Sequence, residues 1–189
     1  CVIIGAYFFY QLSFFATQGG DTKGNGAVLR IEKISEEANR IHNVTDGFSV
    51  VYPNSWTPAQ GTTKDVRLHL YNDRKTSDKN SYELTDGVEF KILSLAPQNN
   101  IDYYLSQKPG IKYREIKIGS LFGYEKVSKL QIEDDFSLKP IDKEDSLVRQ
   151  FLVISSRNQL HMISCLSVGN DYVHLDEECK DVAQSIVFD

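Results

Sequence analysis

The stretch Gly47-Phe48-Ser49-Val50-Val51-Tyr52-Pro53-Asn54-Ser55-Trp56 decides the fold of this chain. Phe48, Val50 and Tyr52 alternate with smaller or outward-facing residues, which is the period of a strand with one buried face. Pro53 ends strand pairing because it has no N–H to donate. A turn then allows Trp56 to fold back over the end of the strand. The stretch therefore predicts the opening strand of a folded domain.

Further strands are predicted along most of the remaining chain by alternating apolar and polar residues. They cover residues 66–71, 88–95, 113–118, 124–132, 148–155 and 160–167, and the last two form a hairpin that turns at Arg157-Asn158. Polar stretches at 72–81 and 133–145 are expected to be loops. A short helix is expected from about residue 101 to 107, ended by Pro109-Gly110.

The C-terminal segment carries the strongest helical pattern. Its apolar residues fall on one stripe at helical spacing: Leu175, Cys179, Val182, Ala183 and Ile186. We expect Asp176, Glu177 and Glu178 in the first turn, where carboxylates favour the positive end of the helix dipole. Because strands dominate and helices are few, the fold class is α+β, with a central antiparallel β-sheet flanked by helices.

Residues 1–18 are predicted to be a membrane-spanning anchor. Residues 1–20 carry no charge and are mostly apolar, with an aromatic set that faces lipid or partner helices: Tyr7, Phe8, Phe9, Tyr10, Phe14 and Phe15. The stretch approaches the ~30 Å thickness of a bilayer core, and a few preceding residues would complete the span. The alternatives are the apolar part of a signal peptide and a buried helix. Cys1 is either a lipidation site, as in a lipoprotein, or an ordinary membrane cysteine.

Residues 19–45 are expected to form a linker and a short amphipathic segment before the domain at 46–189. The Gly-rich part around residues 19–26 suits a flexible linker. Apolar residues at 31, 34, 38 and 41 then recur at helical spacing and favour a short helix, although residues 28–31 would also suit a strand. Asn43-Val44-Thr45 fits the N-glycosylation pattern, which we interpret as ordinary loop.

The order of these elements resembles the PsbP-like domain, named after an extrinsic protein of photosystem II. The resemblance covers residues 43–189 and rests on Asp46-Gly47-Phe48 through Trp56, on the helix around 101–105, on Gly123 opening a strand, on the hairpin of 148–167 and on the closing run 179–188. It implies an α-β-α sandwich around an antiparallel sheet. Most members of this family are not enzymes, and some act as accessory subunits on the outer side of a membrane.

Cys165 and Cys179 are the candidate disulfide, because packing the last helix on the sheet brings a strand end and a buried helix face together. A bond closing a loop of this length contributes roughly 3 kcal/mol and indicates an oxidising compartment. The alternative is two buried, reduced thiols.

Other chemistry finds little support in the sequence. The net charge of −5 argues against nucleic acid as a partner. The four histidines lack ligand spacing, and the acidic residues between 134 and 145 fit no calcium-loop pattern, so we expect no metal and no cofactor. Neither a nucleophile elbow nor an activated thiol is present, so we expect no catalytic residue and no enzyme.

Together these features predict a single-pass or lipid-anchored membrane protein with its domain on the periplasmic, lumenal or extracellular side. The leading hypothesis is a non-catalytic accessory or assembly subunit of a larger membrane protein complex, such as a photosynthetic one, held in the lipid bilayer by its N-terminal segment. The alternative is a tethered binding module or lipoprotein for a small or apolar ligand.

Overall fold

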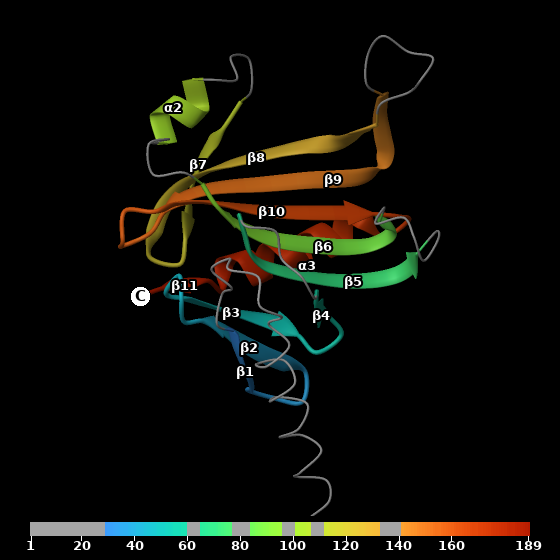
Figure 1. Ribbon diagram of the computed structural model, residues 1–189. Coiled ribbons are helices and arrows are strands. Elements are labelled where there is room, and N and C mark those ends of the chain that lie inside the picture. The colour runs from blue at the N-terminus through green and yellow to red at the C-terminus, as the bar shows by residue number, and fades with distance from the viewer. Residues whose placement is uncertain (1–28, 60–64, 77–83, 96–100, 107–111, 133–140) are drawn as a thin grey trace, which may run out of the picture.

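The computed structural model describes residues 29–59, 65–76, 84–95, 101–106, 112–132 and 141–189 (Figure 1). The predicted anchor at 1–18, with Cys1 and its aromatic residues, lies outside these ranges. Within them, no helix combines the length and the apolar character needed to cross a bilayer.

The described residues form two antiparallel sheets. The smaller sheet has the order β1-β2-β3-β11, formed by β1 (Leu29–Lys33), β2 (Ala38–Asn43), β3 (Phe48–Pro53) and β11 (Val187–Phe188). The larger sheet has the order β4-β5-β6-β10-β9-β8-β7. Its strands are β4 (Thr57–Pro58), β5 (Val66–Thr76), β6 (Leu84–Ser94), β7 (Arg114–Ile118), β8 (Leu121–Ile132), β9 (Ile141–Ile154) and β10 (Leu160–Val168).

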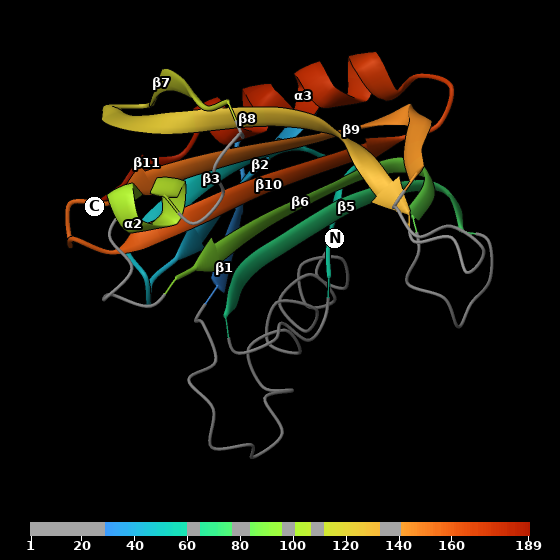
Figure 2. The ribbon, with the colours of Figure 1, turned by 90° about the horizontal axis from the view of Figure 1, so that it is seen from above.

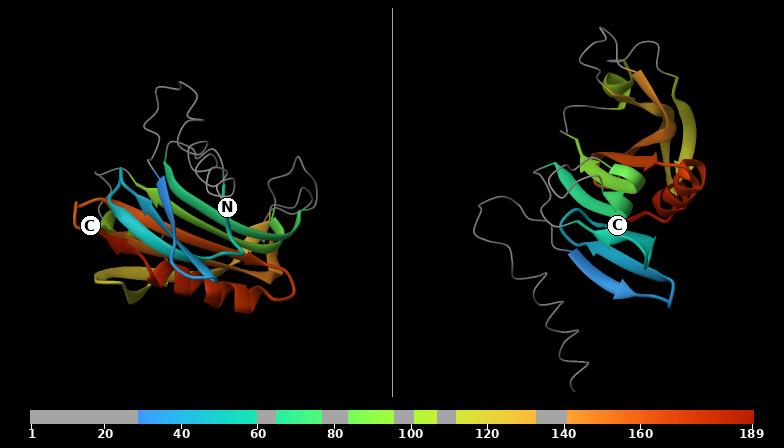
Figure 3. Two further views of the ribbon diagram at one scale, coloured as in Figure 1. Left: turned by 90° about the horizontal axis from the view of Figure 1, so that it is seen from below. Right: turned by 90° about the vertical axis from the view of Figure 1, so that its right-hand side faces the viewer.

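Two helices lie on opposite sides of the larger sheet. The long helix α3 (Tyr172–Gln184) covers one face, and the short helix α2 (Ile101–Ser106) lies on the other side near one end (Figure 2). The smaller sheet lies beyond β5 (Figure 3). Strand β11, which directly follows the C-terminal end of α3, pairs with β3 in this sheet. The predicted single central sheet is therefore divided into two sheets, and its α3 face is the one that is well covered.

The predicted opening strand, β3, lies at the centre of the core. Phe48 and Val50 are buried, as is Trp56, which follows the predicted turn. The Trp56 indole packs 6.4 Å from the Phe90 ring and donates a hydrogen bond to Glu178 of α3. Ser185, at the end of α3, exchanges hydrogen bonds with the N–H and C=O of Val51. The stretch that defines β3 thus contacts the middle and the C-terminal end of the last helix.

The helix favoured between residues 31 and 41 is wrong, because this segment is the β1–β2 hairpin. Ile31 faces Ile41 across the pair, and Ser35 accepts hydrogen bonds from the N–H groups of residues 37 and 38 in the turn. Only Ile41 is fully buried, whereas Ile34 lies exposed in the turn. The spacing of three or four residues between these apolar positions therefore arises from two strands folded back on each other. The smaller sheet begins at Leu29, before the expected domain start at residue 46.

Two other expectations need correction. The strands β5 and β9 run through polar residues that were expected to be loop, reaching Thr76 and starting at Ile141, because both strands pair along that length with a neighbour. Helix α3 begins at Tyr172, so Asp176 lies one turn inside the helix instead of in the first turn. Asp176 is buried, and its partner is an arginine rather than the helix dipole.

Candidate functional site

The face of the larger sheet that is turned away from α3, called the open face below, carries many half-buried side chains. Residues in register on neighbouring antiparallel strands share one face of a sheet. The register gives three rows on this face: Leu93, Met162, Leu152 and Tyr124; Lys91, Ser164, Gln150 and Lys126; Glu89, Leu166, Val148 and Ser128. The first row is apolar, the second is polar with a lysine at each end, and the third is mixed.

A charged cluster lies at the β5–β6 side of the open face. Glu89 Oε1 lies 2.8 Å from His69 Nε2 and 2.7 Å from Lys91 Nζ. Burial opposes the ionisation of Glu89, but the hydrogen bonds from His69 and Lys91 outweigh it and hold the pKa of Glu89 below its ordinary value. The carboxylate is therefore ionised at neutral pH and already neutralised by its neighbours.

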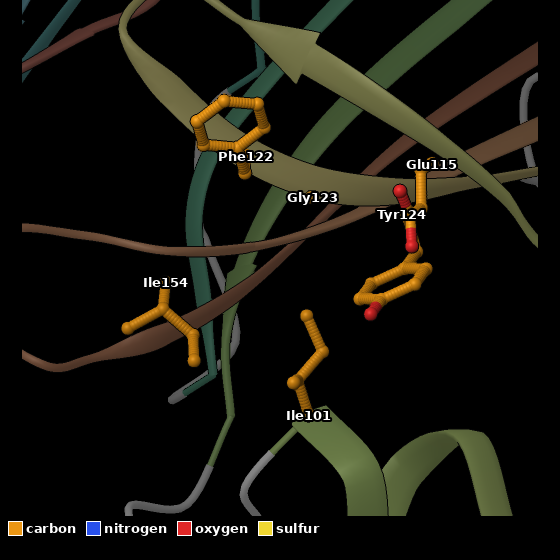
Figure 4. Close-up of a pocket in the computed structure, with 6 residues that line it drawn as sticks. All are labelled: Ile101, Glu115, Phe122, Gly123, Tyr124 and Ile154. Carbon is orange, nitrogen blue, oxygen red and sulfur yellow. The ribbon is translucent and has the colours of Figure 1, made fainter.

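A pocket lies at the other end of the open face, under α2. It has a volume of about 280 Å³ and is lined by Ile101, Glu115, Phe122, Gly123, Tyr124 and Ile154 (Figure 4). Ile101 points up from α2 toward the strands, while the Tyr124 ring and Ile154 point toward Ile101. The lining is mainly apolar, with the Glu115 carboxylate beside Tyr124 at one side. Pockets of this kind bind the apolar part of a ligand.

Phe122, which lines this pocket, is unusually exposed for an aromatic residue. Its side chain is 81% exposed, the largest exposure among the large apolar residues described. Lys117, its partner on β7, places Nζ 5.8 Å from the ring centroid. Behind it, Gly123 allows β8 to approach β9 closely, since an added Cβ would collide with the Leu152 carbonyl oxygen. An exposed aromatic ring next to an apolar pocket is a common feature of binding surfaces.

The opposite face contains a buried ion network that fastens α3 to the sheet. Arg149 of β9 donates hydrogen bonds to Asp176 of α3, with Nε 3.1 Å from Oδ1, and to Glu125 of β8. Both carboxylate side chains are 2% exposed. Arg114 binds the second oxygen of Glu125, with its Nε at 2.9 Å. The hydrogen bonds that Arg149 donates to Asp176 raise the pKa of Arg149 above its ordinary value, burial opposes this, and the bond to Glu125 adds to the rise. These charges are fully paired, so they hold structure and leave no reactive group free.

The disulfide is the second link between α3 and the sheet. Cys165 of β10 and Cys179 of α3 are bonded, with Cα atoms 6.0 Å apart, and both are fully buried in the core. The two cysteines favoured from the sequence therefore come together as expected. Because the pair closes a segment of 14 residues, it restricts the unfolded chain and stabilises the domain.

His161 of β10 is buried where the two sheets meet. Its ring lies 5.0 Å from the Phe188 ring and 6.4 Å from the Phe48 ring, and Nδ1 is 3.3 Å from Ser94 Oγ. Burial lowers the pKa of His161 to about 4; the nearby Asp46 carboxylate raises it somewhat, and Arg67 lowers it. The residue is therefore a neutral core histidine at neutral pH.

The remaining candidates from the sequence have ordinary roles. Asn43 of the glycosylation pattern is 1% exposed, and its amide donates to Asp46 Oδ2 and to the Arg67 carbonyl. His42 and His69 each lie beside a glutamate, and His174 is exposed on α3. No group of three or more potential metal ligands gathers among the residues that the structure describes.

Sequence reasoning missed the pocket and the ion network. Ile101 and Ile154 are far apart in sequence, and only the packing of α2 against β9 brings them together. The sequence carries a weak signal for the ion network. Glu125 and Arg149 are charged residues on the buried side of their strands, where the other residues are mostly apolar. A charged residue at such a position requires a buried partner.

Comparison with known proteins supports the fold. The sequence matches no family model and no curated protein. Among solved structures, cyanobacterial PsbP (CyanoP) from Synechocystis sp. PCC 6803 superposes with a TM-score of 0.50 at 11% identity, covering 90% of this chain and 99% of that one. LpqN, described as involved in cell envelope biogenesis of Mycobacterium tuberculosis, gives a TM-score of 0.49 at 10% identity, with 89% and 98% covered. The superposition on CyanoP shows that the chain has a PsbP-like fold.

Proposed function

We propose that this chain is a non-catalytic accessory or assembly subunit, with its PsbP-like domain outside the cytoplasm and its N-terminal segment in a membrane. The observation that carries the proposal is the buried Cys165–Cys179 bond, because structural disulfides form and persist in oxidising compartments. The PsbP-like fold agrees with this assignment but does not by itself define a function. The charged groups that the structure buries are all paired within the fold, which favours a binding role over a catalytic one.

The docking surface in this proposal is the corner formed by Phe122 and the edge strand β7. The edge strand has free backbone groups on one side, and an exposed aromatic ring next to it provides an anchor of the kind found at the centre of interfaces. The proposed partner is a subunit of the same membrane assembly.

Purification of the tagged full chain from its source membrane in mild detergent tests this proposal. We expect a defined set of membrane subunits to copurify with the wild type and to be lost from Phe122→Ser. Val187→Ser removes a comparably exposed apolar side chain from the smaller sheet and is the matched control. Recovery of the wild type as a free monomer would overturn the accessory role.

A second candidate function is a binding module for an apolar ligand, and the pocket under α2 favours it. The lining by Ile101, Tyr124 and Ile154 is mainly apolar. Native mass spectrometry of the full chain released from mild detergent should show a retained small molecule. Ile101→Asp should remove that mass, whereas repeated spectra of the empty wild type would count against a ligand.

A further inference from the structure

The polar row of the open face places two cations beside neutral hydrogen-bonding groups. Lys126 of β8 faces Gln150 of β9, and Ser164 and Lys91 continue the row across β10 and β6. All four side chains are half-buried on the sheet. Glu89 already neutralises Lys91, whereas Lys126 forms no ion pair with any residue in the described part of the chain. The β8–β9 end of the row therefore has one uncompensated positive charge next to the Gln150 amide.

An apolar path leads from this charge to the pocket. Tyr124 and Phe122 precede Lys126 on β8 by two and four residues, so all three side chains lie on the same face of the sheet. On β9, Leu152 and Ile154 run beside them, and Ile101 of α2 closes the end. The four residue steps from Lys126 to Phe122 span about 14 Å at strand spacing, which suits an alkyl chain of about ten carbons.

The charges on the path also fix a direction. The Glu115 carboxylate lies beside Tyr124 at the pocket and would repel an anionic group placed there. Lys126 and Gln150, at the other end, offer an ammonium and an amide to an anionic group. A ligand with a negative head and an apolar tail is therefore complementary to this surface in one orientation.

We propose that the open face along β8 and β9 binds a single-chain anionic amphiphile, with its head group at Lys126 and Gln150 and its alkyl chain ending in the pocket under α2. The proposal rests on the second function above, ligand binding at that pocket, and adds the class of ligand. Lys126 selects the anionic head, and the apolar lining accepts the chain.

The test is photolabelling of the full chain in nanodiscs of zwitterionic lipid, with a diazirine analogue of dodecanoic acid. Mass spectrometry then locates the labelled peptides. We expect labelling at peptides that contain residues 122–124 and 154, and competition by dodecanoate at concentrations about tenfold lower than by dodecyl maltoside or dodecyltrimethylammonium. Octanoate should compete less well than dodecanoate because its chain does not reach Ile101.

Variants separate the head group from the chain. Lys126→Gln should raise the dodecanoate concentration needed for competition about tenfold and leave the concentration of dodecyl maltoside needed for competition unchanged. Gln150→Lys should lower the dodecanoate concentration needed. Lys33→Gln removes an exposed lysine of the smaller sheet and should change nothing. Labelling at the same peptides with equal competition by all three head groups would overturn the anionic class but leave ligand binding intact. Preferred competition by the cationic probe would overturn the assigned direction. The absence of site-specific labelling would overturn both this proposal and the ligand-binding function.

Discussion

Replacing His161 should remove a pH-dependent part of the stability of this domain. The pKa of His161 is lowered to about 4 by burial, whereas an unfolded histidine has a pKa of about 6.5. Between these values the unfolded chain binds a proton that the folded chain does not, so the free energy of unfolding falls as the pH drops through this range. Above pH 6.5 the ring is neutral in both states and contributes no pH dependence.

The size of the effect follows from the two pKa values. Between pH 7.5 and pH 5.0 the proton taken up on unfolding costs the fold about 2 kcal/mol, rising toward about 3 kcal/mol near pH 4. In His161→Phe the aromatic ring stays between Phe48 and Phe188, and the proton-binding group is gone. The variant should therefore lose about 2 kcal/mol less than the wild type over the same interval.

Denaturant unfolding of the full chain, followed by the fluorescence of Trp56, measures this difference. Trp56 is the single tryptophan and is 2% exposed next to Phe90, so its emission reports the opening of the core. His174→Gln, which removes an exposed histidine of α3, is the control and should behave like the wild type. Equal losses of stability between pH 7.5 and 5.0 in the wild type and His161→Phe would refute the reasoning.

Three further predictions concern how α3 and β8 are held. Arg149→Met should lower the free energy of unfolding by about 3–5 kcal/mol because it leaves the buried Asp176 carboxylate unpaired and Glu125 with Arg114 as its one remaining partner. Adding Glu125→Gln and Asp176→Asn should recover part of this loss, and an unchanged denaturation midpoint would contradict the ion network. Cys179→Ala should cost about 3 kcal/mol in non-reducing buffer, and the difference from the wild type should shrink when reductant is added. Gly123→Ala should lower the thermal midpoint by an amount corresponding to about 1–3 kcal/mol, because its methyl group pushes β8 away from β9; a variant as stable as the wild type would show that the two strands do not need this close approach.

Local sequence patterns correctly predicted the strands and the helix that have one face buried along their whole length. β3 alternates because one of its faces is buried throughout, and the β9–β10 hairpin and α3 show equally regular patterns. The β1–β2 hairpin was predicted to be a helix because β1 is exposed on both faces, so its apolar residues show no strand period. Strand β9 starts within an acidic segment whose pairing with β8 depends on neighbours far away in sequence.

The candidate site depended even more on tertiary structure. The cysteine pair was accessible from sequence because one cysteine ends a strand and the other lies on the apolar stripe of a helix. By contrast, Asp176 looked like a residue that stabilises the start of a helix, and only the true start at Tyr172 shows that it faces Arg149. The open face and its pocket require the strand order, which no local pattern contains.

The redox state of Cys165 and Cys179 in the source cells tests the location of the domain most directly. Intact cells are treated with a membrane-permeant maleimide, the chain is purified without reductant, and peptides containing each of the two cysteines are analysed by mass. An extracytoplasmic domain predicts both peptides linked to each other and free of maleimide. Both cysteines recovered as unlinked maleimide adducts, after denaturation in the presence of the reagent, would contradict it.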